Sequence, residues 1–165
     1  MPERTLIVDH LTLTYSGLFD LNAFYRYLME WLSTNHFVPY EARNEELTTK
    51  NGKDIIIELL PYKKYTDHFK GIMKIEINFV GIKPVEVEKH ETKVKLNKGF
   101  VKIVIDGYLE TEYEKYWERR ATLFFFKLLF DKLFFKRYTL MYENAIKQDV
   151  YKLYDALQHF FNLYK

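Results

Sequence analysis

The chain has 165 residues, a net charge of +2 and no cysteine. Its length predicts one domain, residues 1–165, that buries a core of its own. The small net charge argues against a strong overall field for nucleic acid, and the lack of cysteine excludes disulfides, thiol nucleophiles and cysteine metal sites.

The N-terminal part of the chain predicts a strand followed by a helix. Within residues 5–15 the apolar residues Ile7, Leu11, Leu13 and Tyr15 recur at even spacing, which predicts a strand that ends at Gly17. Asp20 has the side chain of a good N-cap, so a helix is predicted from there to about Asn35. Apolar residues recur at three and four along this helix, which therefore has one apolar face.

The middle of the chain, residues 40–113, predicts a series of strands because the apolar period becomes two. Asn51 and Gly52 lie between two such runs and indicate a tight hairpin. A second hairpin with a charged outer face is predicted over residues 84–96. The same alternation continues over residues 107–117, so these strands are expected to form a meander.

The helical period returns after Arg120. From Ile146 to Tyr164 the apolar residues follow a 4-3-4-3-4 spacing, which predicts an amphipathic helix of about five turns that docks on the sheet. The predicted class is α+β: a single antiparallel sheet of about five to seven strands in β-α-β-meander-α order, packed on one face by an N-terminal helix and long C-terminal helices. Residues 122–126 fit either the end of the sheet or the start of a helix.

This element order resembles the helix-grip arrangement, in which a curved sheet wraps a long C-terminal helix. Many helix-grip proteins hold an apolar ligand between sheet and helix, so the resemblance implies that such a ligand is one option here. The phrases GYLETEYEKYW and FDKLFFKRY are similar to uncharacterised small archaeal proteins, and that resemblance implies no activity. Abundant lysine and glutamate with little glutamine is a thermophile-like bias.

The spacing of polar residues predicts no catalytic or metal-binding motif. No two histidines are four residues apart, and the two serines and six separated glycines suggest neither a nucleophile elbow nor a phosphate loop. We therefore predict no catalytic residue, no metal and no cofactor, and favour a protein that is not an enzyme. A buried acid–base pair assembled by the fold stays open. Three glutamates are expected to point into solvent from one strand: Glu110, Glu112 and Glu114.

The segment LFFFKLLFDKLFFKR, residues 123–137, contains six phenylalanines among fifteen residues. On a helix its charged residues fall on several sides, so it has no clean polar face. Three interpretations follow: a buried central helix whose lysine stems lie along apolar surface, a protein interface such as a homodimer, or a peripheral helix on anionic lipid.

We favour a non-enzymatic binding or assembly protein that uses this aromatic-rich C-terminal region for contact with a protein partner or with itself. The partner or lipid contact candidates are Phe124, Lys127, Lys132, Phe134, Phe135, Lys136 and Arg137. One alternative is a carrier or enzyme that encloses an apolar ligand, with the lining candidates Tyr25, Trp31, Phe126, Phe130 and Phe161. A further alternative is binding to a membrane or lipid surface through residues 124–137, whereas nucleic acid is not expected.

The expected location is the cytoplasm. The charged, alternating first residues do not resemble a signal peptide, and no run of about eighteen apolar residues predicts a spanning helix. The absence of cysteine fits a reducing compartment.

Overall fold

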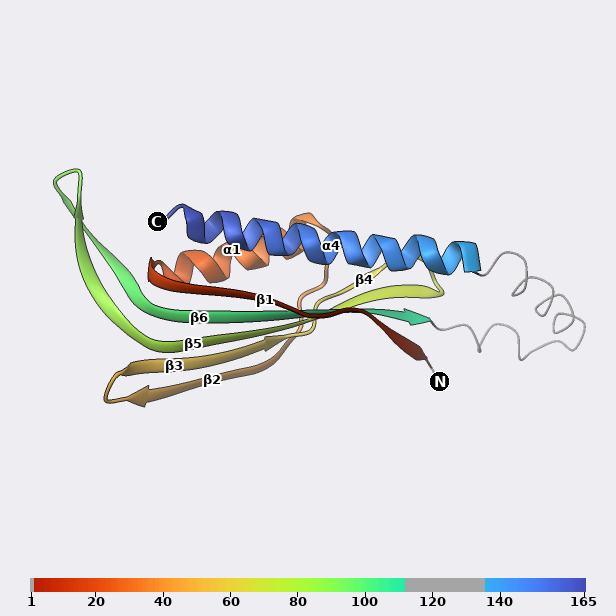
Figure 1. The fold of residues 1–165 in the computed structure, drawn as a ribbon, viewed down its shortest axis with the longest axis horizontal. Helices are drawn as coiled ribbons and strands as arrows, with labels where there is room; N and C mark the ends of the chain where they lie inside the picture. Colours follow the sequence, from red (N-terminus) through yellow and green to blue (C-terminus); the bar gives the residue numbers. More distant parts are fainter. Residues whose placement is uncertain (1, 112–135) are drawn as a thin grey trace, which may run out of the picture.

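The computed structural model describes residues 2–111 and 136–165, which form one open antiparallel sheet with two helices on one face (Figure 1). The α+β class and the single antiparallel sheet predicted from the sequence are confirmed. The strand order is β1-β6-β5-β3-β2, with the short β4 paired to β5. In chain order the elements are β1 (Glu3–Phe19), α1 (Leu21–Thr34), β2 (Glu41–Thr49), β3 (Gly52–Leu59), β4 (Tyr62–Lys64), β5 (Phe69–Lys89), β6 (Thr92–Thr111) and α4 (Lys136–Asn162).

The two long strands β5 and β6 form the centre of the sheet. They pair in one antiparallel ladder that joins residues 69–89 to residues 92–111. The hairpin predicted over residues 84–96 is the far end of this ladder, and it projects beyond the helices (Figure 1). Its turn residues, His90 and Glu91, have positive φ angles of 50° and 62°, which suit the twist of a tight hairpin.

β1 is longer than the predicted strand, and the predicted end at Gly17 is wrong. The strand starts at Glu3 and runs through Gly17 to Phe19. Gly17 has a φ of 147° and still pairs with Gly99 of β6. Glycine adopts this angle without a steric penalty, so the ladder continues where a residue with a Cβ atom would be strained.

The helix predicted after Asp20 is confirmed as α1, which ends at Thr34. The Asp20 carboxylate accepts a hydrogen bond of 3.0 Å from the backbone N–H of Ala23, as an N-cap does. The backbone N–H of Leu21 donates to the Asn97 side chain of β6, which ties the start of the helix to the sheet. The buried face of α1 consists of Phe24, Leu28 and Leu32.

The hairpin signalled by Asn51 and Gly52 is also confirmed. Thr49 of β2 pairs with Gly52 of β3, which leaves Lys50 and Asn51 as the two turn residues. Gly52 is therefore the first residue of the returning strand, where its φ of 126° again requires glycine.

Aromatic side chains fill the space between the helices and the sheet. Phe24 of α1 stacks on Phe161 of α4 with ring centroids 5.3 Å apart, and meets Phe79 of β5 edge-on at 5.7 Å. All three rings are buried, and rings of this size remove large apolar areas from water. The predicted docking of the C-terminal helix is confirmed, because its apolar stripe is buried: Ile146, Val150, Leu153, Leu157 and Phe160.

α4 also carries one buried acid, Asp149. Its carboxylate accepts a hydrogen bond of 3.0 Å from the Tyr65 hydroxyl and lies 3.3 Å from the Lys63 ammonium. A buried carboxylate is tolerated when it is paired in this way. The interaction joins α4 to the chain at β4, and the apolar periodicity of the helix does not reveal it.

Replacing Phe24 by Ala should lower the free energy of unfolding by about 3–5 kcal/mol, because it removes a buried ring and leaves a cavity. The neighbouring Tyr25 is exposed, so Tyr25→Ala should cost about 1 kcal/mol or less. Urea unfolding of both variants measures the difference. Equal losses would contradict the aromatic core.

Candidate functional site

A β-bulge in β1 gathers polar side chains on the face of the sheet opposite to α1 and α4, the helices within residues 2–111 and 136–165. Val8 pairs with Gly107 and Leu11 pairs with Ile105, so Asp9 and His10 together stand opposite one residue of β6. Such a two-against-one arrangement disrupts the strict alternation of side chains. The buried residue before the bulge is Val8, whereas the buried residues after it are the odd-numbered Leu13, Tyr15 and Phe19.

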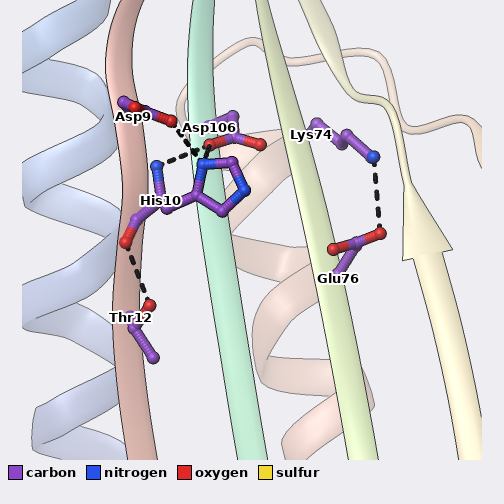
Figure 2. Close-up of polar contacts among 6 residues, drawn as sticks. All are labelled: Asp9, His10, Thr12, Lys74, Glu76 and Asp106. Carbon is purple, nitrogen blue, oxygen red and sulfur yellow. Dashed lines mark hydrogen bonds and ion pairs between the residues drawn. The ribbon is translucent and has the colours of Figure 1, made fainter.

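The residue opposite the bulge is Asp106, and its side chain holds the bulge in place. Its Oδ1 accepts a hydrogen bond of 2.6 Å from the backbone N–H of His10. The His10 Nδ1 lies 3.2 Å from the same oxygen and also contacts Oδ1 of Asp9 (Figure 2). The Thr12 hydroxyl donates to the His10 carbonyl at 2.9 Å. His10 thus has both backbone groups bound while its φ is 50°, a left-handed angle that non-glycine residues rarely adopt.

The three side chains differ in exposure. Asp106 is buried, whereas Asp9 and His10 are open to solvent. The hydrogen bond with Asp9, followed by the charge of Asp106, raises the pKa of His10 above 6.5. The cluster therefore attracts positive charge, and each of its residues offers a ligand atom within 4.8 Å of the others. It is the group of described residues best placed to hold a cation.

Sequence reasoning missed this cluster and predicted no metal ligand. The cluster joins two neighbours in β1 to a residue 96 positions later, so no local motif marks it. Its one trace in the sequence is the adjacent polar pair Asp9 and His10, which follows the apolar residues 6–8 and precedes the alternation of residues 11–15.

The expectation that Glu110 points into solvent is wrong. Glu110 is only 3% exposed, because β1 extends far enough to lay Arg4 against it. The Arg4 Nε donates to its carboxylate at 2.6 Å, and the Lys70 ammonium lies 3.5 Å away. Burial alone would raise the pKa of Glu110, but the Arg4 hydrogen bond and the Lys70 charge outweigh it, so the pKa is lowered. Glu112 and Glu114 lie outside the described residues.

The contact candidates are only partly within the described residues. Lys136 and Arg137 are exposed on the first turn of α4. None of the residues 136–145 is buried, and Leu140 and Met141 are more than half exposed, at 56% and 52%. The other candidates lie outside the described residues: Phe124, Lys127, Lys132, Phe134 and Phe135.

A shallow apolar hollow lies on this first part of α4. It has a volume of about 300 Å³, and the described residues that line it are Lys136, Thr139, Leu140 and Glu143. These positions are i, i+3, i+4 and i+7, the four residues that form a hole for the knob of a partner helix in knobs-into-holes packing.

The described cavity candidates do not converge on one enclosed space. Phe161 stacks on Tyr15 at 4.6 Å and borders an open groove of about 270 Å³ between β1 and the end of α4. Trp31 stacks on Phe37, whereas Tyr25 is exposed and donates to Glu41. Phe126 and Phe130 lie outside the described residues.

Comparison with known proteins finds no matching family, no matching curated protein and no matching solved structure. Among the described residues, none of the helices has the length and apolar content needed to cross a membrane.

Replacing Glu110 by Gln should lower the free energy of unfolding near pH 7 by about 1.5–3 kcal/mol, the usual worth of hydrogen bonds to a charged group. Because the folded pKa is lowered, the contribution is complete above the ordinary value of 4.5 and is lost as the pH falls through the folded pKa. The difference in the free energy of unfolding between the unmodified chain and Glu110→Gln, measured with urea, should therefore become smaller at acid pH.

The exposed Glu88 on the β5–β6 hairpin provides the control, because Glu88→Gln should change stability little at either pH. A gap for Glu110→Gln that stays constant with pH would contradict the ionised, bound state of Glu110.

Proposed function

We propose that this protein is a binding and assembly protein, and that it associates with a second copy through the first part of α4. The observation that carries this proposal is the exposed hollow with i, i+3, i+4, i+7 spacing on residues 136–143. Apolar residues with this exposure, on a stretch where no residue is buried, are typical of a surface that a partner covers.

A second copy is the partner that fits the charges around the hollow. In a two-fold dimer, the same surface is used by both chains and must complement itself. If two α4 helices cross antiparallel with the two-fold axis between Thr139 and Leu140, Lys136 of one copy stands opposite Glu143 of the other. Leu140 of each copy then enters the hollow of its neighbour. Both ends of the contact carry an opposite-charge pair, so the pairing is favourable in this one register.

The same part of α4 continues the phenylalanine-rich stretch that motivated the sequence prediction, and Lys136 and Arg137 belong to both. Tyr142 holds the inner side of this stretch to the start of β5 by stacking on Phe69, with ring centroids 4.6 Å apart. Leu140 is two residues away and so lies on roughly the opposite side of the helix. The helix is therefore anchored on one side while its other side is available to a partner.

The two other functions considered from the sequence have less support. An apolar ligand between sheet and helix would need space that the packed rings of Phe24, Phe79 and Phe161 occupy. Binding to a lipid surface would use the same exposed residues of α4, including Lys136 and Arg137. The experiment below therefore distinguishes lipid binding from self-association.

The test is the mass of the protein in solution at about 100 μM, where a dimer of micromolar affinity is populated. The unmodified chain should be a dimer, and Leu140→Glu with Met141→Glu should be a monomer with an unchanged circular dichroism spectrum. Leu163→Glu is the matched control, because Leu163 is equally apolar and 67% exposed but lies just beyond the other end of α4. It should remain a dimer.

A charge exchange tests the register. Lys136→Glu alone should weaken the dimer by roughly tenfold or more, because it places two acids opposite each other, and adding Glu143→Lys should restore it. A monomeric unmodified chain would overturn the proposal. If that monomer sediments with anionic vesicles at low salt, the lipid function replaces it.

A further inference from the structure

We propose that Asp9, His10 and Asp106 form a binding site for a divalent transition-metal ion on the open face of the sheet. This site is independent of the contact surface on α4, because it lies on the opposite face of the sheet from the helices (Figures 1 and 2). One imidazole and two carboxylates form a mixed nitrogen and oxygen ligand set, which suits Zn²⁺ and its neighbours in the first transition row.

The spacing of the ligand atoms fits such an ion. The Nδ1 of His10 and Oδ1 of Asp106 are 3.2 Å apart. With metal–ligand bonds of about 2.0–2.1 Å, two neighbouring ligands lie about 2.9 Å apart in an octahedral site and about 3.3 Å apart in a tetrahedral one. The observed distance falls between these two values. Asp9 Oδ1 is closer to the ring than either geometry allows, and its exposed side chain is free to rotate outward onto the ion.

The least mobile ligand is the buried one. Asp106 lies within β6, where it stands between the bulge of β1 and Lys74 of β5. Its hydrogen bond from the His10 backbone holds the carboxylate beside the imidazole before any ion arrives. The Thr12 hydroxyl donates to the His10 carbonyl, and this second hydrogen bond helps to fix His10 at its positive φ angle. Strained backbone that the surroundings over-determine is typical of binding sites.

The charges around the cluster also favour a cation. Lys74 is the strand neighbour of Asp106, but its ammonium lies 3.3 Å from Glu76, toward which its side chain turns in Figure 2. Among the described residues, the imidazole is therefore the close positive partner that the carboxylates of Asp9 and Asp106 share. With a neutral imidazole the three ligands carry two negative charges, which one divalent ion balances. Because Asp9 and His10 are exposed, water can complete the coordination shell.

The experiment is a calorimetric titration of the full chain with Zn²⁺, using protein purified without an oligohistidine tag. The unmodified chain should bind about one Zn²⁺. His10→Ala should weaken binding by at least about tenfold, since even the outer partners of metal ligands are worth about 10–100-fold. His10 is exposed, so this variant should stay folded.

Two further variants make the test specific. His36→Ala is the matched control, because His36 also has a positive φ, 65°, but lies outside the cluster, and it should bind Zn²⁺ like the unmodified chain. Asp106→Asn keeps an oxygen acceptor for the His10 N–H while removing the charge, and it should bind more weakly.

A structural readout locates the ion. Paramagnetic Mn²⁺, a weaker-binding ion of the same charge, should broaden the amide signals of residues 9–12 and 105–107 before those of α4. The proposal is overturned if the unmodified chain binds no Zn²⁺, or if His10→Ala binds it as tightly as the unmodified chain.

Discussion

The antiparallel ladder between β5 and β6 is the constraint on which the rest of the structure depends. Its strands hydrogen-bond over about twenty residues each, and every other element packs against them or extends their sheet. The pleat of this ladder sends alternate side chains to opposite faces. Met73, Ile75 and Ile103 lie in the core under the helices, whereas Lys74, Glu76 and Lys102 lie on the open face. The ladder thus determines which side chains form the core and which polar side chains lie on the open face.

β1 must follow β6 along nearly its whole length, and the bulge results from fitting it there. Val8 faces the core before the bulge, whereas Leu13 and Tyr15 face the core after it. The bulge therefore changes which alternate side chains of β1 point into the core. Two residues, Asp9 and His10, stand opposite one, and both are polar, so the irregularity lies on the solvent side. An apolar pair at the same place would have exposed two large side chains to water.

The fold was largely predictable because its elements are locally consistent. The Asp20 cap, the Asn51–Gly52 hairpin and the apolar stripe of α4 depend on neighbours in sequence, and each was predicted from sequence and is present. The errors arose where a distant strand decides the outcome. Gly17 continues a strand because Gly99 pairs with it, and Glu110 is buried because Arg4 reaches it. The apolar period of one segment carries no information about contacts with a distant strand, so it could predict neither the continuation of β1 at Gly17 nor the burial of Glu110.

The candidate sites differ in the same way. The predicted contact segment, residues 124–137, overlaps the exposed start of α4 at Lys136 and Arg137, and a local pattern of apolar and basic residues marks that segment. The cluster at Asp9, His10 and Asp106 was not predictable in this way, because its geometry comes from a register shift between strands. Both sites lie where regular packing on the sheet is interrupted. One is at a bulge in β1, and the other is on the turns of α4 that precede its buried apolar stripe. Apart from Asp106, these residues lie outside the buried core, and for that reason we propose that their basic and ligand-like side chains serve binding.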